Sequence, residues 1–109
     1  MSVDSNQLSD NIGEDADLLK ELVEIFAEHY PAQLQLLQEA IERCDCNSIS
    51  ETAHQIKGSI TLFGSSVSEI AKEIEDSARN NRVDELEQQF AELSEGMKGL
   101  HQELLAITG

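Results

Sequence analysis

Apolar side chains recur along most of the chain at alternating spacings of three and four residues, the period of a helix with one buried face. A first such stripe spans residues 15–30, and a shorter one follows Pro31 as far as residue 44. Pro31 either begins a second helix or only kinks a continuous one, because proline suits a first helical turn but disturbs a helix interior. The apolar positions of the two stripes are Leu18, Leu19, Leu22, Val23, Phe26, Tyr30, Leu34, Leu37 and Ile41.

Three further helices are predicted downstream, each with its own start signal. Ser48-x-x-Glu51 and Ser66-x-x-Glu69 have the spacing of capping boxes, and Asn81-x-x-Asp84 is a suitable start for the last helix. Gly64 is expected to end the third helix in a left-handed conformation. The apolar positions are Ile49, Ala53, Ile56, Ile60 and Phe63, then Val67, Ile70, Ala71, Ile74 and Ala78, and finally Val83, Leu86, Phe90, Leu93, Met97, Leu100, Leu104 and Ile107.

Short connections between the last four predicted helices make neighbouring helices antiparallel. The pattern therefore predicts an all-α fold, an antiparallel up-down-up-down four-helix bundle whose additional N-terminal helix, residues 15–30, covers one end. Residues 1–13 are polar and aperiodic and are expected to be a flexible N-terminal arm, with the helical bundle domain over 14–109. A chain of 109 residues is the size of one domain.

The charge balance excludes several functions. Asp and Glu number 22 against 7 Lys and Arg, a formal net charge of −15, which disfavours nucleic acid and anionic membranes as partners. No apolar run approaches the roughly 20 residues needed to span a bilayer, and the polar start lacks a signal region. We therefore predict a cytoplasmic protein that binds neither nucleic acid nor membrane.

Cysteine and glycine motifs exclude further classes of chemistry. Cys44 and Cys46 have C-x-C spacing with no second pair, so we expect two reduced thiols at a turn between helices rather than a metal or redox site. Neither G-x-x-x-x-G-K-[ST] nor G-x-G-x-x-G occurs, which argues against a nucleotide-hydrolysing enzyme.

The third predicted helix carries a histidine on its outer side. With 100° per residue, His54 lies about 140° and Gly58 about 180° from the apolar stripe, while Lys57 lies about 80° away and is able to lean its ammonium toward the imidazole. A helical glycine costs about 1 kcal/mol relative to alanine, and no turn or cap needs one here. A histidine on the outer face of a helix often has no function. A backbone without a side chain next to it and a cation beside it, however, suit a phosphoryl group bound to the ring nitrogen.

The same segment resembles a known family. Ala53-His54-Gln55-Ile56-Lys57-Gly58-Ser59, with Leu62-Phe63-Gly64 after it, resembles the signature of histidine-containing phosphotransfer (HPt) domains. Asp45 stands where these domains usually carry an aspartate, and Ile74-Glu75 with Ala78-Arg79 is similar to their L-E-x-x-A-R segment. The resemblance covers the chain from about residue 15 to 105.

The resemblance implies a phosphorelay intermediate. His54 would accept a phosphoryl group on Nε2 from the aspartate of one receiver domain and pass it to the aspartate of another, with no kinase activity of its own. Lys57 would offset the phosphoryl charge, Gly58 would admit the partner, and Glu75 would lie near the ring. The interval from Gly64 to Glu75 is one residue shorter than usual, so Asp76 is the alternative contact, and Glu75 as a solvated surface charge is a third reading.

The implied partners are receiver domains of response regulators or of hybrid histidine kinases. Docking would use the surface around His54, with Gln55, Ser59, Thr61, Leu62 and Ser65 as candidates, and Leu62 is either an exposed contact or buried beneath the first helix. No cofactor is assigned to this chain, because the receiver would supply Mg²⁺. Neutral imidazole at pH 7 needs no added base to act as the nucleophile.

Other interpretations remain open on the sequence alone. Glu51-x-x-His54 has the form found in di-iron bundles, but those need a second such motif and inward-facing ligands. A binding or adaptor module of the same shape would dock receivers without exchanging phosphate. The start at Met1 and the end soon after the last helix favour a free-standing module over a piece of a larger kinase. We expect a monomer, and His29 and His101 are expected to be ordinary helix residues.

Overall fold

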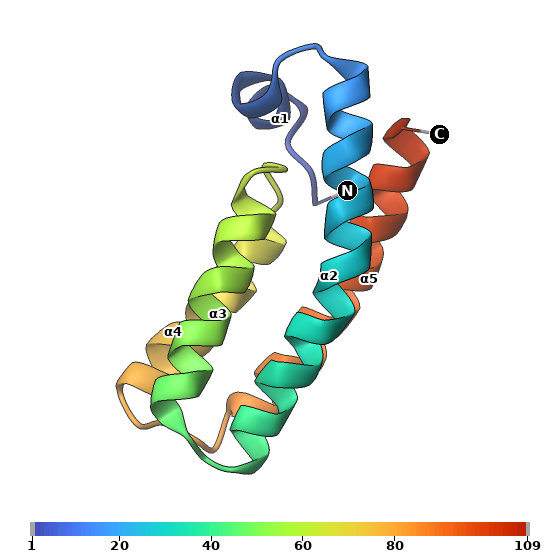
Figure 1. The fold of residues 1–109 in the computed structure, drawn as a ribbon. Coiled ribbons are helices and arrows are strands. Elements are labelled where there is room, and N and C mark those ends of the chain that lie inside the picture. The colour runs from blue at the N-terminus through green and yellow to red at the C-terminus, as the bar shows by residue number, and fades with distance from the viewer. Residues whose placement is uncertain (1, 109) are drawn as a thin grey trace.

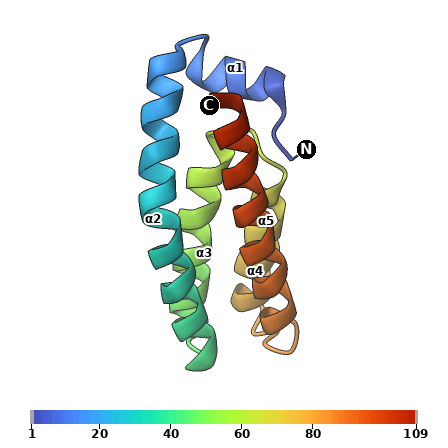
Figure 2. The same ribbon diagram turned by 90° about the vertical axis from the view of Figure 1, so that its right-hand side faces the viewer.

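A computed structural model describes residues 2–108, which form five helices. They are α1 (Ser5–Ile12), α2 (Ala16–Glu42), α3 (Cys46–Thr61), α4 (Val67–Arg79) and α5 (Leu86–Thr108). Helices α2 to α5 run alternately up and down around one core (Figure 1), and α1 lies across one end of them (Figure 2). The predicted all-α four-helix bundle with an additional N-terminal helix is confirmed. Met1 and Gly109, the ends of the predicted arm and domain, lie outside the described residues.

The additional helix is not the predicted one, and the prediction of a flexible arm over 1–13 is wrong for most of that segment. Asp4 caps α1 by accepting hydrogen bonds from the amides of Asn6 at 2.9 Å and Gln7 at 3.2 Å. Leu8 and Ile12 are buried in the core. A helix of eight residues is too short to be stable by propensity, so α1 depends on packing that a sequence pattern does not display.

The residues before α1 pair with the turn between α3 and α4. Val3 forms an isolated antiparallel bridge with Ser65. The carboxylate of Glu103 on α5 accepts hydrogen bonds from the amides of Ser2 at 2.7 Å and Val3 at 3.2 Å. Gly64 has a φ of 66°, in agreement with its predicted left-handed conformation, and an added Cβ would clash with α1. The N-terminal segment thus anchors the end of the α3–α4 hairpin.

Helix α2 runs without interruption through Pro31, so of the two alternatives left open for residues 15–44 the single continuous helix is the one that forms. Pro31 is exposed, which keeps its ring out of the core. The buried positions on both sides of it, Val23 and Phe26 before and Leu34 and Leu37 after, keep the three-four spacing of one face. Continuous packing of that face outweighs the hydrogen bond that proline cannot donate.

Helix α3 begins earlier than predicted, because Asp45 rather than Ser48 is its N-cap. One carboxylate oxygen of Asp45 accepts a hydrogen bond from the amide of Ser48 at 3.2 Å, and the other accepts one from its hydroxyl at 2.9 Å. Ser48 therefore lies inside the first turn, and the Ser48–Glu51 capping box does not form. These bonds, the amide one first, hold the pKa of Asp45 below its usual value.

The starts of α4 and α5 also differ from the prediction. Among the described residues the Ser66 side chain makes no capping hydrogen bond, and the hydroxyl of Ser65 accepts one from the amide of Val67 at 3.1 Å instead. Asn81 has a φ of 55° and belongs to a turn, so α5 begins only at Leu86. Several residues of capping type stand close together at both places, and the spacing alone does not choose among them.

The core is built from the predicted stripes, with exceptions at the ends of the last one. Val83 and Ile107 are each 42% exposed, whereas the stripe between them faces inward. A Cβ added at Gly96 would lie 3.0 Å from Val67 Cγ1, so this glycine allows the start of α4 to approach α5 closely. The buried apolar residues of α3 to α5 are Ile49, Ala53, Ile56, Ile60, Val67, Ala71, Ile74, Ala78, Leu86, Leu93, Met97, Leu100 and Leu104.

Candidate functional site

His54 lies on the outer face of α3, as the helical spacing predicts. Its side chain is 62% exposed, while its neighbours Ala53 and Ile56 are fully buried. The helix is held at its start by Asp45 and at its end by the side-chain amide of Asn11, which donates to two carbonyl oxygens of the last turn at 3.2 and 3.3 Å. The imidazole is therefore presented to solvent on a helix anchored at both ends.

Glu75 on α4 is the residue that contacts the ring. His54 Nδ1 and Glu75 Oε2 are 3.0 Å apart. The same carboxylate binds two cations, with Lys57 Nζ at 3.1 Å from Oε1 and Arg79 Nη2 at 2.8 Å from Oε2. Asp76, the alternative considered from the sequence, lines a separate hollow near the α4–α5 turn. Glu75 is 2% exposed, which excludes its reading as a solvated surface charge.

The cations around Glu75 keep it ionised despite its burial. Burial on its own raises the pKa of the carboxyl, but the hydrogen bond from Lys57 and the charges of Lys57, Arg79 and His54 outweigh it, and the pKa falls below 4.5. An ionised carboxylate only accepts hydrogen bonds, so Nδ1 of His54 must carry the proton of the neutral ring. Nε2 then has the free electron pair and, on the opposite edge of the ring, is directed away from Glu75.

The surface next to His54 on the side of Gly58 is open. Gly58 is exposed one turn further along α3, and a Cβ added there would meet nothing within 4 Å among the described residues. The carbonyl of Lys57 accepts a hydrogen bond from the Thr61 hydroxyl at 2.7 Å. Packing within residues 2–108 does not require a glycine at position 58, so the missing side chain leaves room for what approaches from outside.

The candidate docking residues divide between exposed and buried positions. Gln55 and Thr61 are exposed, and the Ser59 hydroxyl donates to the Gln55 carbonyl at 3.3 Å. Leu62 is half-buried and packs against the core, intermediate between the two readings from sequence. Ser65 is only 4% exposed and is occupied with the N-terminal segment, so its prediction as a docking residue is wrong. Its role is to cap α4.

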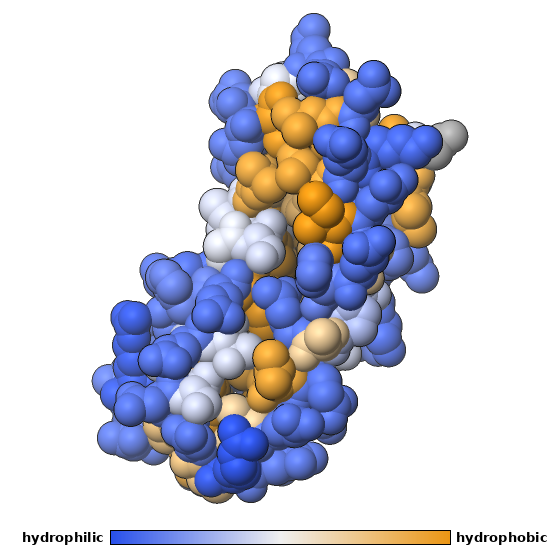
Figure 3. Space-filling view, viewed as in Figure 1, coloured by the Kyte–Doolittle hydropathy of each residue, from blue (hydrophilic) through white to orange (hydrophobic). Residues whose placement is uncertain are grey.

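An apolar groove that sequence reasoning missed lies between α2 and the end of α3. It has a volume of about 130 Å³. Figure 3 shows the apolar surface that gathers over this part of the molecule. Ile25 lines the groove and is 52% exposed, and it lies outside the buried stripe that the sequence predicts for this helix. The groove is lined by Leu22, Ile25, Phe26, Gln33, Ser59, Leu62 and Phe63.

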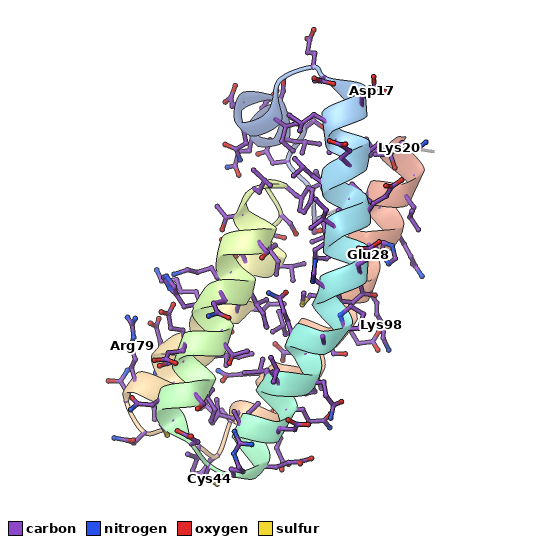
Figure 4. All side chains as sticks on the ribbon, viewed as in Figure 1. Asp17, Lys20, Glu28, Cys44, Arg79 and Lys98 are labelled. Atoms are coloured by element: carbon purple, nitrogen blue, oxygen red, sulfur yellow. The ribbon has the colours of Figure 1, made fainter. Side chains whose placement is uncertain are left out.

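Arg79 was quoted in the family segment but given no role, and it belongs to the site. Its guanidinium contacts Glu75 across one helical turn, at the i,i+4 spacing at which opposite charges on a helix meet. Figure 4 shows Arg79 at the outer side of the α3–α4 pair, away from α2. The spacing of Glu75 and Arg79 was the signal available in the sequence.

Within residues 2–108, no group of three or more His, Cys, Asp or Glu side chains is placed to hold a metal ion. Glu51 and His54 are both exposed on α3, whereas di-iron ligands face the interior of a bundle. None of the helices in this part of the chain has the length and apolar character to cross a membrane.

Comparison with known protein families identifies the family of this chain. The model of the Hpt domain family matches residues 21–105, which include His54 and all three groups that meet at Glu75. The chain belongs to the Hpt domain family. The Hpt domain has a phosphotransfer role in two-component signalling, and that role applies to this chain.

A solved structure supports the fold of this Hpt domain. The crystal structure of histidine-containing phosphotransfer protein B (HptB) from Pseudomonas aeruginosa PAO1 matches with a TM-score of 0.67 and 24% sequence identity. The match covers 94% of this chain and 96% of that chain. At this identity the likeness shows a shared fold. No curated protein sequence matches the chain.

Proposed function

We propose that His54 is the phosphoryl carrier of this Hpt domain, and that it accepts the group from the aspartate of one receiver domain and passes it to the aspartate of another. The observation that carries the proposal is the 3.0 Å contact between His54 Nδ1 and Glu75 Oε2. It holds the ring in the tautomer whose Nε2 is a nucleophile and orients that atom toward solvent.

The transfer step needs few groups from this chain. The Nε2 electron pair forms a bond to phosphorus, the bond from phosphorus to the aspartate oxygen breaks, and its electron pair returns to the receiver carboxylate. The ring gains a positive charge while Nδ1 keeps its proton, and Glu75 lies beside that charge. The reverse sequence of bonds delivers the group to a second receiver. Alignment and charge neutralisation supply most of the catalysis in such transfers, and Mg²⁺ would belong to the receiver.

The receiver domain would dock over the open surface at Gly58. Gln55, Ser59 and Thr61 are on the outer side of α3 around that surface, and the groove between α2 and α3 adds apolar area next to it. An apolar contact of this kind suits a chain of net charge −15, because the charge itself attracts no acidic partner. Lys57 supplies a cation at the point of approach.

The test is transfer from a phosphorylated receiver domain to the wild-type chain, to His54→Gln and to His29→Gln. His29 is an exposed histidine on α2 and serves as the matched control. We expect the wild type and His29→Gln to be labelled and His54→Gln to remain unlabelled. Labelling of His54→Gln at the wild-type level would remove the site assignment. Receiver binding by the wild type without any transfer would instead support an adaptor module.

A further inference from the structure

A hollow separate from the His54 site lies between the last turns of α2 and the first turns of α5, at the end of the molecule away from α1 (Figure 1). None of its lining residues belongs to α3 or α4, the helices that carry His54 and Glu75. Its volume is about 210 Å³, below the roughly 300 Å³ at which pockets for small-molecule ligands begin. A space of this size fits one side chain of a partner better than a cofactor. The hollow is lined by Gln38, Ile41, Glu42, Glu87 and Phe90.

The lining combines apolar side chains with acidic ones. Ile41 and Phe90 are half-buried and pack against the core, whereas Gln38, Glu42 and Glu87 are exposed. Apolar surface of this kind covers the methylene groups of a long basic side chain, while carboxylates at the opening bind its charged head. The aromatic ring favours arginine over lysine, because a planar guanidinium stacks on aromatic rings.

The end of α2 carries negative charge that its own helix disfavours. A helix C-terminus has a partial negative charge and is stabilised by cations, yet the last turn of α2 contains Glu39 and Glu42 and no basic residue. Arg43 follows as the C-cap, but the ion pairs found within residues 2–108 are all those of Glu75. Glu42 therefore opposes the dipole of α2, and no ion pair in this part of the chain compensates it.

Glu87, on the other side of the hollow, differs from Glu42. It lies in the first turn of α5, where an acidic side chain is favourable. Glu87 thus has a structural explanation, and its contribution is a second negative charge in the same space. The net charge of −15 attracts a cationic partner to this place and repels a second copy of this chain.

We propose that the hollow between α2 and α5 binds an arginine side chain of a partner protein, with the guanidinium against Glu42 and Glu87 and the methylene groups against Ile41 and Phe90. The inference does not depend on the proposed function of His54. Free arginine fits less well than an arginine residue, because its own carboxylate would enter a region that already holds two. A protein bound here leaves the outer side of α3 uncovered, so it can hold the Hpt domain while a receiver domain docks.

The experiment titrates the protein with N-acetyl-arginine amide, which presents the side chain as a residue within a protein does, and follows the backbone amide signals by NMR. N-acetyl-citrulline amide has nearly the same shape without the charge, and free arginine adds a carboxylate. The titrations use the wild type, Glu42→Gln and Glu28→Gln. Glu28 is an exposed glutamate about 21 Å from Glu42 along α2 and serves as the matched control (Figure 4).

We expect the arginine amide to cause saturable shifts of the signals of Ile41, Glu42, Glu87 and Phe90, free arginine to bind more weakly, and the citrulline derivative to cause no such shifts. Glu42→Gln should weaken binding about threefold, the effect of one exposed ion pair, and Glu28→Gln should leave it unchanged. Equal shifts from the citrulline derivative, or equal affinities of Glu42→Gln and the wild type, would overturn the proposal. Free arginine that binds as tightly as the amide would overturn the assignment to a partner protein.

Thermal unfolding gives a second readout with the opposite sign. Removal of a negative charge from the C-terminus of α2 should raise the melting temperature of Glu42→Gln by a few degrees, although the same change weakens binding of the arginine amide. A glutamate needed for a contact within the fold would lower the melting temperature on replacement, and that result would contradict the role given to Glu42. Neither variant alters the surroundings of His54, so loss of phosphotransfer in the wild type would bear on the proposed function alone.

Discussion

Replacing Gly58 with alanine should stabilise the protein, which is the reverse of what most core or helix substitutions do. Glycine in a helix interior costs about 1 kcal/mol relative to alanine. A Cβ at position 58 meets nothing within 4 Å among the described residues. The described glycines with a left-handed backbone, which an alanine would strain, are Gly13 and Gly64, so Gly58 is free of that strain as well. The free energy of unfolding should therefore rise by nearly the whole propensity difference, about 1 kcal/mol, and the melting temperature by about 4–8 °C.

Two other helical glycines provide matched controls for this stability measurement. Gly99→Ala also places its Cβ in open space and should give a similar gain. Gly96→Ala places its Cβ 3.0 Å from Val67 Cγ1 and 3.3 Å from Cγ2, so crowding should cancel the gain or reverse it. Urea denaturation of the three variants measures each difference. A loss of stability in Gly58→Ala would refute the account of this surface.

A larger substitution at Gly58 tests the access of the partner separately from the stability of the protein. Lysine is also a good helix former, so Gly58→Lys should keep the helical content while its side chain covers the approach to His54. We expect phosphotransfer from a receiver to fall by at least about tenfold, the equivalent of about 1.4 kcal/mol of lost contact, and Gly99→Lys to transfer normally. Wild-type transfer by Gly58→Lys would show that the bare backbone at Gly58 has no role in partner access.

Three further substitutions test the contacts that hold the site and the fold. Glu75→Gln should reduce the free energy of unfolding at pH 7 by about 1–2 kcal/mol. Because the pKa of Glu75 in the folded protein is lowered from 4.5, the carboxylate stabilises the fold above that pH. The difference in stability between the variant and the wild type should therefore disappear as the pH falls further, which urea denaturation at several pH values measures. Asn11→Ala should cost about 0.5–1 kcal/mol and speed amide exchange in the last turn of α3, and unchanged exchange would contradict the capping role. Pro31→Ala should stabilise α2 by about 1–3 kcal/mol in the same denaturation assay, and a loss would mean that the proline is needed there.

The outward placement of His54 and Gly58 was predictable because it depends only on the helical period. Ile49, Ile56 and Ile60 define the inner face of α3 without ambiguity, so the opposite face follows from 100° per residue. The contact with Glu75 was not predictable in this way. It depends on how closely α4 approaches α3, and that approach is possible because Ala71 and Ala78 on the facing side of α4 are small and fully buried.

The errors in the sequence prediction share a physical origin in tertiary packing. Helix α1 has only Leu8 and Ile12 as apolar anchors, and nothing in its own eight residues outweighs the entropy of ordering them. The local preference of Pro31 left a break and a continuous helix both open, and the apolar face of α2, which continues through Pro31, decides for the continuous helix. Ser65 has the composition of a solvent-exposed turn but is covered by the N-terminal segment.

The distribution of charge favours the proposed position of the phosphoryl group at His54. The chain has a formal net charge of −15, so most of its surface repels a dianion. Beside His54, however, the two cations Lys57 and Arg79 bind the one buried carboxylate of Glu75, and the exposed Glu51 lines the same hollow as His54 and Arg79. Glu75 is the centre of this arrangement because it holds both cations beside the ring. Its replacement should therefore lower phosphotransfer from a receiver domain through the positions of Arg79 and Lys57 as well as through the ring itself.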